Sequence, residues 1–203
     1  MRRIAPLLAL LLASCGSSPP THYFMLAVVP QAHEEYGAIS TPIMVASVNV
    51  PPSLDRRSMV RRTGVNTVVV SEQDRWAAPL GAMIQRVLAQ DLAMRLPTGQ
   101  VVLPESPPPP HTNRIVVSLA QFEPTSHGNV VLNGSWSLLA GDQEKTALYR
   151  NIALETGLPS TDAKGQALAM SRLVGQLASH IAETLATTTR LGQSGTSRKS
   201  AKR

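Results

Sequence analysis

The chain has 203 residues, which is enough for one domain with a substantial hydrophobic core. Its formal net charge is +6, but seven of its 19 basic residues lie near the two ends, which leaves 12 basic against 13 acidic residues in the body. This balance argues against a nucleic-acid-binding face, and the single cysteine excludes an internal disulfide.

The first 15 residues have the layout of a bacterial lipoprotein signal. Two arginines precede a short apolar run from Ile4 to Ala13, which ends just before Cys15. A membrane-spanning helix needs about 20 apolar residues, so this run is too short to span a bilayer and predicts a signal peptide over residues 1–14 that is removed. The Leu-Ala-Ser-Cys string resembles a lipobox, which implies that a lipid is attached to Cys15. The alternative is a free or buried thiol after an ordinary signal peptide.

Residues 15–22 are predicted to be a tether between the lipid and the domain, because the segment from Gly16 to Thr21 is small, polar and proline-bearing; fully extended, that segment is about 20 Å long. Two or three acyl chains give stable attachment, whereas a single chain binds only marginally. The residue after the cysteine is Gly16, not the aspartate that usually retains lipoproteins in the inner membrane. We therefore expect a lipid anchor in the outer membrane, with the domain on the periplasmic face.

The strands are predicted from short apolar runs bounded by proline, glycine or polar residues. In the run 130–139, the residues Val130, Leu132, Trp136 and Leu138 share one face, which we expect to be buried. The expected strands are 23–29, 43–50, 58–62, 65–71, 101–103, 114–122, 130–139 and 146–154.

Two helices are predicted from apolar residues at spacings of three and four. The first spans 76–96, with Arg95 off its apolar stripe. The second is capped by Ser160 or Thr161 and extends to 186. Together the elements predict a single α+β domain over 23–186, with a mixed, mostly antiparallel sheet and two helices packed on one face. Residues 187–203 are polar and basic and are expected to be a disordered tail.

No pattern of catalytic or metal-binding residues stands out in the sequence. The five histidines occur singly, without HExxH spacing, and no G-x-S-x-G elbow or phosphate-binding glycine loop is present. We therefore expect neither enzymatic activity nor a metal or cofactor.

A group of four arginines lies within residues 56–62, after Asp55 and shortly before Arg75 and Trp76. One interpretation is a solvated strand edge, where basic residues discourage association between sheets. The other is a recognition edge for a partner protein, because Arg and Trp are enriched at interaction hot spots. Trp76 is expected in the core.

Three segments resemble the PqiC family of ABC-type transport auxiliary lipoproteins: the stretch from Cys15 to Leu26, the Pro-Pro-x-Leu-Asp-Arg stretch that leads to Arg62, and Arg-Trp-Ala-Ala-Pro-Leu from Arg75. The resemblance implies a non-catalytic lipoprotein that docks an MCE-domain transport protein and its membrane components at the outer membrane, forms a homo-oligomer, and supports lipid movement and envelope integrity. It marks Asp55, Arg56, Arg62, Arg75 and Trp76 as motif positions, and leaves open whether they face a partner or form the fold.

Two other functions remain open at this stage. A periplasmic carrier of lipid or another hydrophobic ligand would have a continuous apolar cavity between sheet and helices, whereas a docking component would have a filled core and an exposed interaction surface. An envelope hydrolase would place a histidine within hydrogen-bonding reach of a serine or threonine in a cleft.

Overall fold

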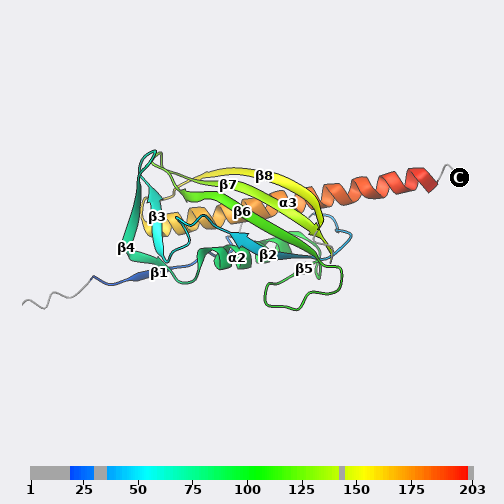
Figure 1. The fold of residues 1–203 in the computed structure, drawn as a ribbon, viewed down its shortest axis with the longest axis horizontal. Coiled ribbons are helices and arrows are strands. Elements are labelled where there is room, and N and C mark those ends of the chain that lie inside the picture. The colour runs from blue at the N-terminus through cyan, green and yellow to red at the C-terminus, as the bar shows by residue number, and fades with distance from the viewer. Residues whose placement is uncertain (1–18, 30–35, 142–144, 201–203) are drawn as a thin grey trace, which may run out of the picture.

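Two sheets and two helices enclose one hydrophobic core in the computed structural model, which describes residues 19–29, 36–141 and 145–200 (Figure 1). The predicted signal peptide and Cys15 lie outside this range. The strands are β1 (His22–Phe24), β2 (Ile43–Asn49), β3 (Ser58–Arg62), β4 (Val68–Trp76), β5 (Val101–Val102), β6 (Asn113–Pro124), β7 (Asn129–Ala140) and β8 (Lys145–Gly157), and the helices are α2 (Leu80–Arg95) and α3 (Ala163–Ser200).

The larger sheet has five strands in the order β5-β2-β6-β7-β8. Strand β2 runs parallel to both of its neighbours, whereas β6, β7 and β8 form the predicted antiparallel run. The face of β7 that was expected to be buried is buried, which confirms the alternating pattern. Gly134 lies in the middle of β7 because a Cβ atom there would stand 2.3 Å from the carbonyl oxygen of Ser118 on β6.

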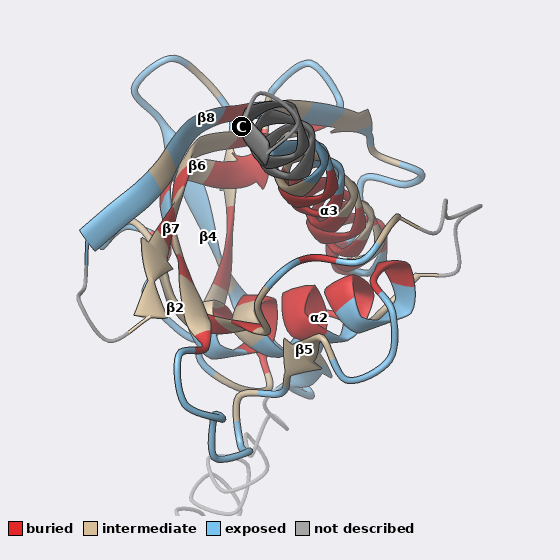
Figure 2. Ribbon diagram, turned by 90° about the vertical axis from the view of Figure 1, so that its right-hand side faces the viewer, coloured by how far each residue is buried: buried red, intermediate tan, exposed pale blue. Residues whose placement is uncertain are grey.

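Helices α2 and α3 both cover one face of the five-stranded sheet and pack against each other (Figure 2). The single α+β domain is therefore confirmed. The first helix begins at Leu80, however, and the prediction that it begins at Trp76 is wrong. Trp76 is the last residue of β4, and Pro79, which fixes its own φ and has no N–H, immediately precedes the helix.

The other three strands form a separate sheet in the order β1-β4-β3. Strands β3 and β4 are the predicted hairpin, and β1 pairs in parallel with the far end of β4. The sequence predicted one sheet. The hairpin is separate because its β4 arm pairs with the N-terminal segment and not with a strand of the larger sheet.

Helix α3 differs from its prediction at both ends. Its N-terminus is capped by Asp162, whose Oδ1 accepts a hydrogen bond of 2.7 Å from the Gly165 N–H, and not by Ser160 or Thr161. Hydrogen bonds from the Ser160 hydroxyl and then from Gly165 lower the pKa of Asp162. At the other end the helix continues to Ser200, where the sequence predicted disorder from 187. No proline interrupts it, and each residue added to an existing helix gains a backbone hydrogen bond.

A charged pair is buried where α2 meets α3. The guanidinium of Arg95 donates to Asp91 Oδ1 at 3.0 Å and to the Ser179 hydroxyl on α3 at 2.9 Å, and both members of the pair are at most 3% exposed. Asp91 Oδ2 is buried and has no hydrogen-bond partner in the described part of the chain. Burial therefore raises the pKa of Asp91, and the charge of Arg95 only partly offsets this effect.

Candidate partner-binding surface and pocket

The three segments that carry the family resemblance meet at Trp76. The Trp76 N–H donates to the carbonyl oxygen of Arg57 at 2.6 Å, and the next residue, Ala77, donates to the Phe24 carbonyl at 2.9 Å. In the β1–β4 register, Phe24 lies opposite Trp76 and Tyr23 opposite Arg75. The Trp76 side chain is 2% exposed, so this motif position packs in the core.

The proline-bearing segment before β3 is a tight turn that inserts one side chain into the core. The N–H groups of Leu54 and Asp55 both donate to the carbonyl oxygen of Pro51, at 2.9 and 3.1 Å. Leu54 is buried, whereas Asp55 and Arg56 are exposed. Leu54 therefore anchors the turn in the core, and the two charged residues after it are available to solvent.

Arg62 joins the two sheets. Its Nε and Nη2 donate to Glu123 Oε1 on β6 at 3.0 and 2.7 Å, and its Nη1 donates to the carbonyl of Val65 at 3.1 Å. The Glu123 side chain is 5% exposed, and its other oxygen accepts from the Phe122 N–H. The contacts of Arg62 are therefore made within the fold.

We expect the substitution Arg62→Ala to lower the free energy of unfolding by about 2–3 kcal/mol, because it leaves the buried Glu123 carboxylate without its cation. The Arg62 side chain is partly solvated, so the expected cost is smaller than for a fully buried pair. Urea unfolding measures the change. Arg57→Ala, at an exposed position near the same hairpin, is the control and should change stability by less than about 0.5 kcal/mol. Equal effects of the two substitutions would contradict the bracing role of Arg62.

Three of the other four arginines of this region form an exposed arginine cluster, which we define as Arg56, Arg57 and Arg75. The hydrogen bond between the backbones of Arg57 and Trp76, together with the pairing of Ser58 with Arg75, brings the cluster together. These three side chains are the exposed arginines of the predicted recognition edge, beside the exposed Asp55. Their contact with a partner remains a prediction.

The β3–β4 hairpin also carries an exposed apolar surface that sequence reasoning missed. We define the valine arm as Val65, Val68, Val69 and Val70, whose exposed fractions are 88, 43, 54 and 39%. A continuous β-branched run is typical of a strand buried on both faces. Here the run projects from the body, and such an apolar patch is typical of an interaction surface.

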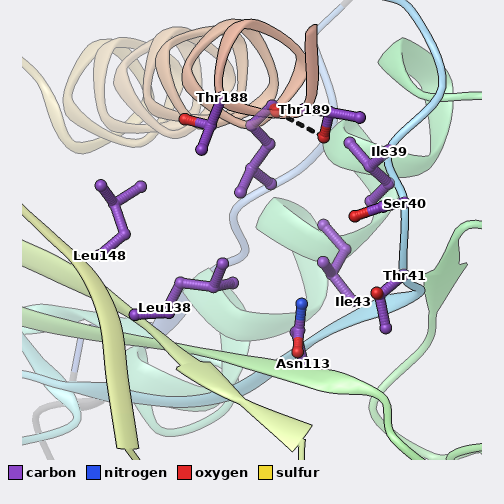
Figure 3. A pocket seen from close by; sticks show the side chains of 11 residues that line it. Ile39, Ser40, Thr41, Ile43, Asn113, Leu138, Leu148, Thr188 and Thr189 are labelled. Atoms are coloured by element: carbon purple, nitrogen blue, oxygen red, sulfur yellow. Dashed lines mark hydrogen bonds between the residues drawn. The ribbon is translucent and has the colours of Figure 1, made fainter. Parts of the chain in front are cut away.

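The space between the five-stranded sheet and the helices is filled. Phe122, Leu132 and Leu173 are among its fully buried side chains, so the continuous cavity expected of a carrier is not seen among the described residues. A pocket of about 380 Å³ lies instead at the end of the sheet where α3 passes β7 and β8 (Figure 3). Aliphatic side chains form its interior, and hydroxyl and amide groups line its opening.

Of the described histidines, His22 and His180 do not show the arrangement expected of a hydrolase. His180 and Thr184 line a second pocket, but the threonine hydroxyl donates to the backbone carbonyl of His180 and not to its ring. His22 Nδ1 lies 3.3 Å from a carboxylate oxygen of Asp74, at the surface. Within residues 19–29, 36–141 and 145–200, no three histidine, cysteine or acidic side chains are grouped to hold a metal ion.

Comparison with protein families decides the identity of the domain. The family model described as ABC-type transport auxiliary lipoprotein component matches residues 24–182, which span both sheets and both helices. The chain belongs to this family. The match includes the turn at Leu54, Arg62 and Trp76, and it ends on α3 before the predicted tail.

Two relatives of this auxiliary lipoprotein have a transport role in their names. The chain is 28% identical over 132 residues to the intermembrane transport lipoprotein PqiC of Escherichia coli K12, which corresponds to 64% of this chain and 70% of PqiC. The PqiC of Shigella flexneri matches to the same extent.

Solved structures show the same fold for the auxiliary lipoprotein. One crystal structure aligns with a TM-score of 0.65 at 19% identity and covers 82% of this chain and 99% of that protein. A Xanthomonas campestris protein aligns with a TM-score of 0.61 at 16% identity, over 85% and 99% of the two chains. No helix within the described part of the chain is long and apolar enough to cross a membrane.

Proposed function

We propose that this auxiliary lipoprotein is a non-catalytic component of an intermembrane lipid transport system. In this role it is attached to the periplasmic face of the outer membrane through acylated Cys15, docks an MCE-domain transport protein there, and supports envelope integrity. The family match over 24–182 carries the proposal, and the similarity to proteins named for intermembrane transport supports it.

The arrangement of the two ends of the domain suits such a docking role. Strand β1, the first strand, lies at the end of the body that carries the three-stranded sheet, whereas α3 leaves the body at the opposite end (Figure 1). The seven peptide steps from Cys15 to His22 span at most about 25 Å. A lipid on Cys15 would therefore hold the three-stranded sheet close to the bilayer and direct the opposite end toward the periplasm.

Two exposed surfaces on the three-stranded sheet are available for protein contacts. The valine arm offers apolar area, and the arginine cluster offers donors for acidic or carbonyl groups of a partner. We assign the arginine cluster to the MCE-domain protein and the valine arm to contact between copies of this chain in a homo-oligomer.

The double charge reversal Arg56→Glu/Arg57→Glu tests the docking surface. Arg62 is left unchanged because its reversal would place two carboxylates together with Glu123. The matched control is Lys145→Glu/Arg150→Glu, which reverses two exposed basic residues on β8. We expect the first variant to capture at least about tenfold less MCE-domain protein from detergent-solubilised membranes than the wild type, a loss of about 1.4 kcal/mol in binding.

The control variant should capture the partner as the wild type does. Urea unfolding of both variants checks that the fold is intact. If the cluster variant is folded and still captures the MCE-domain protein fully, the arginine cluster is not the docking surface. If the wild type itself captures no transport protein, the proposed function is wrong.

A further inference from the structure

The pocket at the end of the sheet has an aliphatic interior. Its walls come from the loop before β2, from the ends of β6, β7 and β8, and from the last buried turn of α3 (Figure 3). Because both the sheet and the helix are fixed by the filled core, the pocket is held open between two rigid walls. Its aliphatic lining residues are Ile39, Ile43, Leu138, Leu148 and Leu185.

The opening of the pocket is polar, and none of the described residues that line it is acidic or basic. The hydroxyls of Thr188 and Thr189 donate to helix carbonyls, and Asn113 Oδ1 accepts from the Gly141 N–H at 3.0 Å. The Asn113 amide NH₂ and the hydroxyls of Ser40 and Thr41 have no hydrogen-bond partner among the described residues. These groups are donors placed at the end of an apolar pocket.

We propose that this pocket binds one acyl chain of an ester lipid. The chain would fill the aliphatic interior, and the ester carbonyl would accept hydrogen bonds from Asn113, Ser40 or Thr41 at the opening. Among the described lining residues none is cationic, so a free fatty acid, whose carboxylate would lose water without gaining a charged partner from them, fits this lining less well than an ester lipid. A volume of about 380 Å³ is near the lower end for ligand sites, which suits one chain and not a whole diacyl lipid.

The pocket lies far along α3 from the end of the domain that carries β1. Asp74, which contacts His22 of β1, lines a pocket together with Ala163 at the start of α3. Leu185 lies 22 residues further along the helix, about 33 Å away at 1.5 Å per residue. The inference deepens the proposed transport role and rests on it for the source of the lipid.

Photolabelling of the full chain tests the proposal. The purified protein is reconstituted in phosphatidylethanolamine vesicles that contain a photoreactive phosphatidylethanolamine with a diazirine at the acyl terminus. One arm uses the monoacyl probe and the other the diacyl probe. We expect mass spectrometry to locate the label on peptides that contain Ile43, Leu138 or Leu148. Labelling by the diacyl probe identifies one chain of a membrane lipid as the ligand, and labelling by the monoacyl probe alone identifies a lysolipid.

Two substitutions close the pocket from opposite walls, and each has an adjacent control. Ala147→Phe on β8 and Thr188→Phe on α3 should each lower labelling of these peptides at least tenfold. Thr146→Phe and Thr187→Phe, at exposed neighbouring positions outside the lining, should leave labelling unchanged. Because the two closing substitutions lie on different elements, the test remains valid if one of the variants does not fold.

Label outside the pocket peptides, or equal labelling of the closed variants and their controls, would overturn the acyl-chain site. Capture of the MCE-domain protein is measured on the same variants and should be unchanged by Ala147→Phe. Loss of labelling with intact capture therefore supports the site without involving the docking surface. Absence of capture in the wild type, with pocket labelling retained, would refute the docking function and leave the site in place.

Discussion

Replacing Arg95 with methionine is expected to lower the free energy of unfolding by about 3–5 kcal/mol at neutral pH, because the substitution leaves the Asp91 carboxylate buried without a cation. Asp91 is 1% exposed and already has one oxygen without a partner. Urea unfolding of wild type and variant measures the loss.

The loss should depend on pH in a defined direction. The pKa of Asp91 is raised in the folded protein, so the folded state holds the proton at pH values where the unfolded chain has released it. The contribution of this group to stability therefore falls as pH rises from the unfolded pKa through the folded one. The positive charge of Arg95 lowers the pKa of Asp91, so in Arg95→Met the folded-state pKa of Asp91 is higher and the pH range over which stability is lost extends upward. The deficit of Arg95→Met should accordingly shrink toward acidic pH.

The double variant Asp91→Leu/Arg95→Met is the control for this interpretation. Replacing both members of a buried pair with apolar residues of similar size is often neutral or stabilising. We expect the double variant to recover most of the loss, even though Ser179 loses its contact with Arg95. A double variant that is as unstable as Arg95→Met would show that packing between α2 and α3, and not the uncompensated charge, causes the effect.

The substitution Trp76→Ala is expected to destabilise the protein by about 3–5 kcal/mol, because it removes a large buried side chain and leaves a cavity. Trp76 lies where β1, β4 and the turn after Pro51 are joined by backbone hydrogen bonds. The loss should therefore affect the three-stranded sheet as a unit. Urea unfolding measures the stability, and hydrogen exchange of the β1 and β4 amides locates the change.

The control for Trp76 is the conservative variant Trp76→Phe, which keeps an aromatic ring in the core and should retain most of the stability. If Trp76 served partner contact instead, its substitution would lower capture of the partner and leave stability unchanged. If Trp76→Ala had wild-type stability but lost capture of the MCE-domain protein, Trp76 would be an interface residue. Its buried side chain would then not be what stabilises the fold.

Most of the fold could be predicted from the sequence because its signals are local. The alternation along β7, the β3–β4 hairpin and the apolar stripe of α3 each follow from the period of the element and from burial on one face. The last residue of β4, Trp76, was assigned to the helix because it is in register with the apolar residues of α2. Pairing with β1, which is 52 residues away in the register of His22 with Asp74, determines its conformation instead.

The site was harder to predict because it depends on contacts between distant segments. The sequence does not distinguish the arginines near Asp55 from one another. Arg62 differs from its exposed neighbours because Glu123, on the distant strand β6, accepts its hydrogen bonds. Arg95 lies off the apolar stripe, and its burial follows from the crossing of α3. The pocket was not predicted at all, since it is formed by five segments that carry no motif.

The short parallel pairing of β1 with β4 has a mechanical consequence. If the protein is attached to a membrane through a lipid on Cys15 and is bound by a partner elsewhere, tension between the membrane and the partner enters the domain through His22, Tyr23 and Phe24. These residues are pulled along the strand direction, so the hydrogen bonds to β4 share the force and do not open one after another. Trp76, held on its other side by the backbone of Arg57, would then be the point where a pull on the lipid reaches the rest of the molecule.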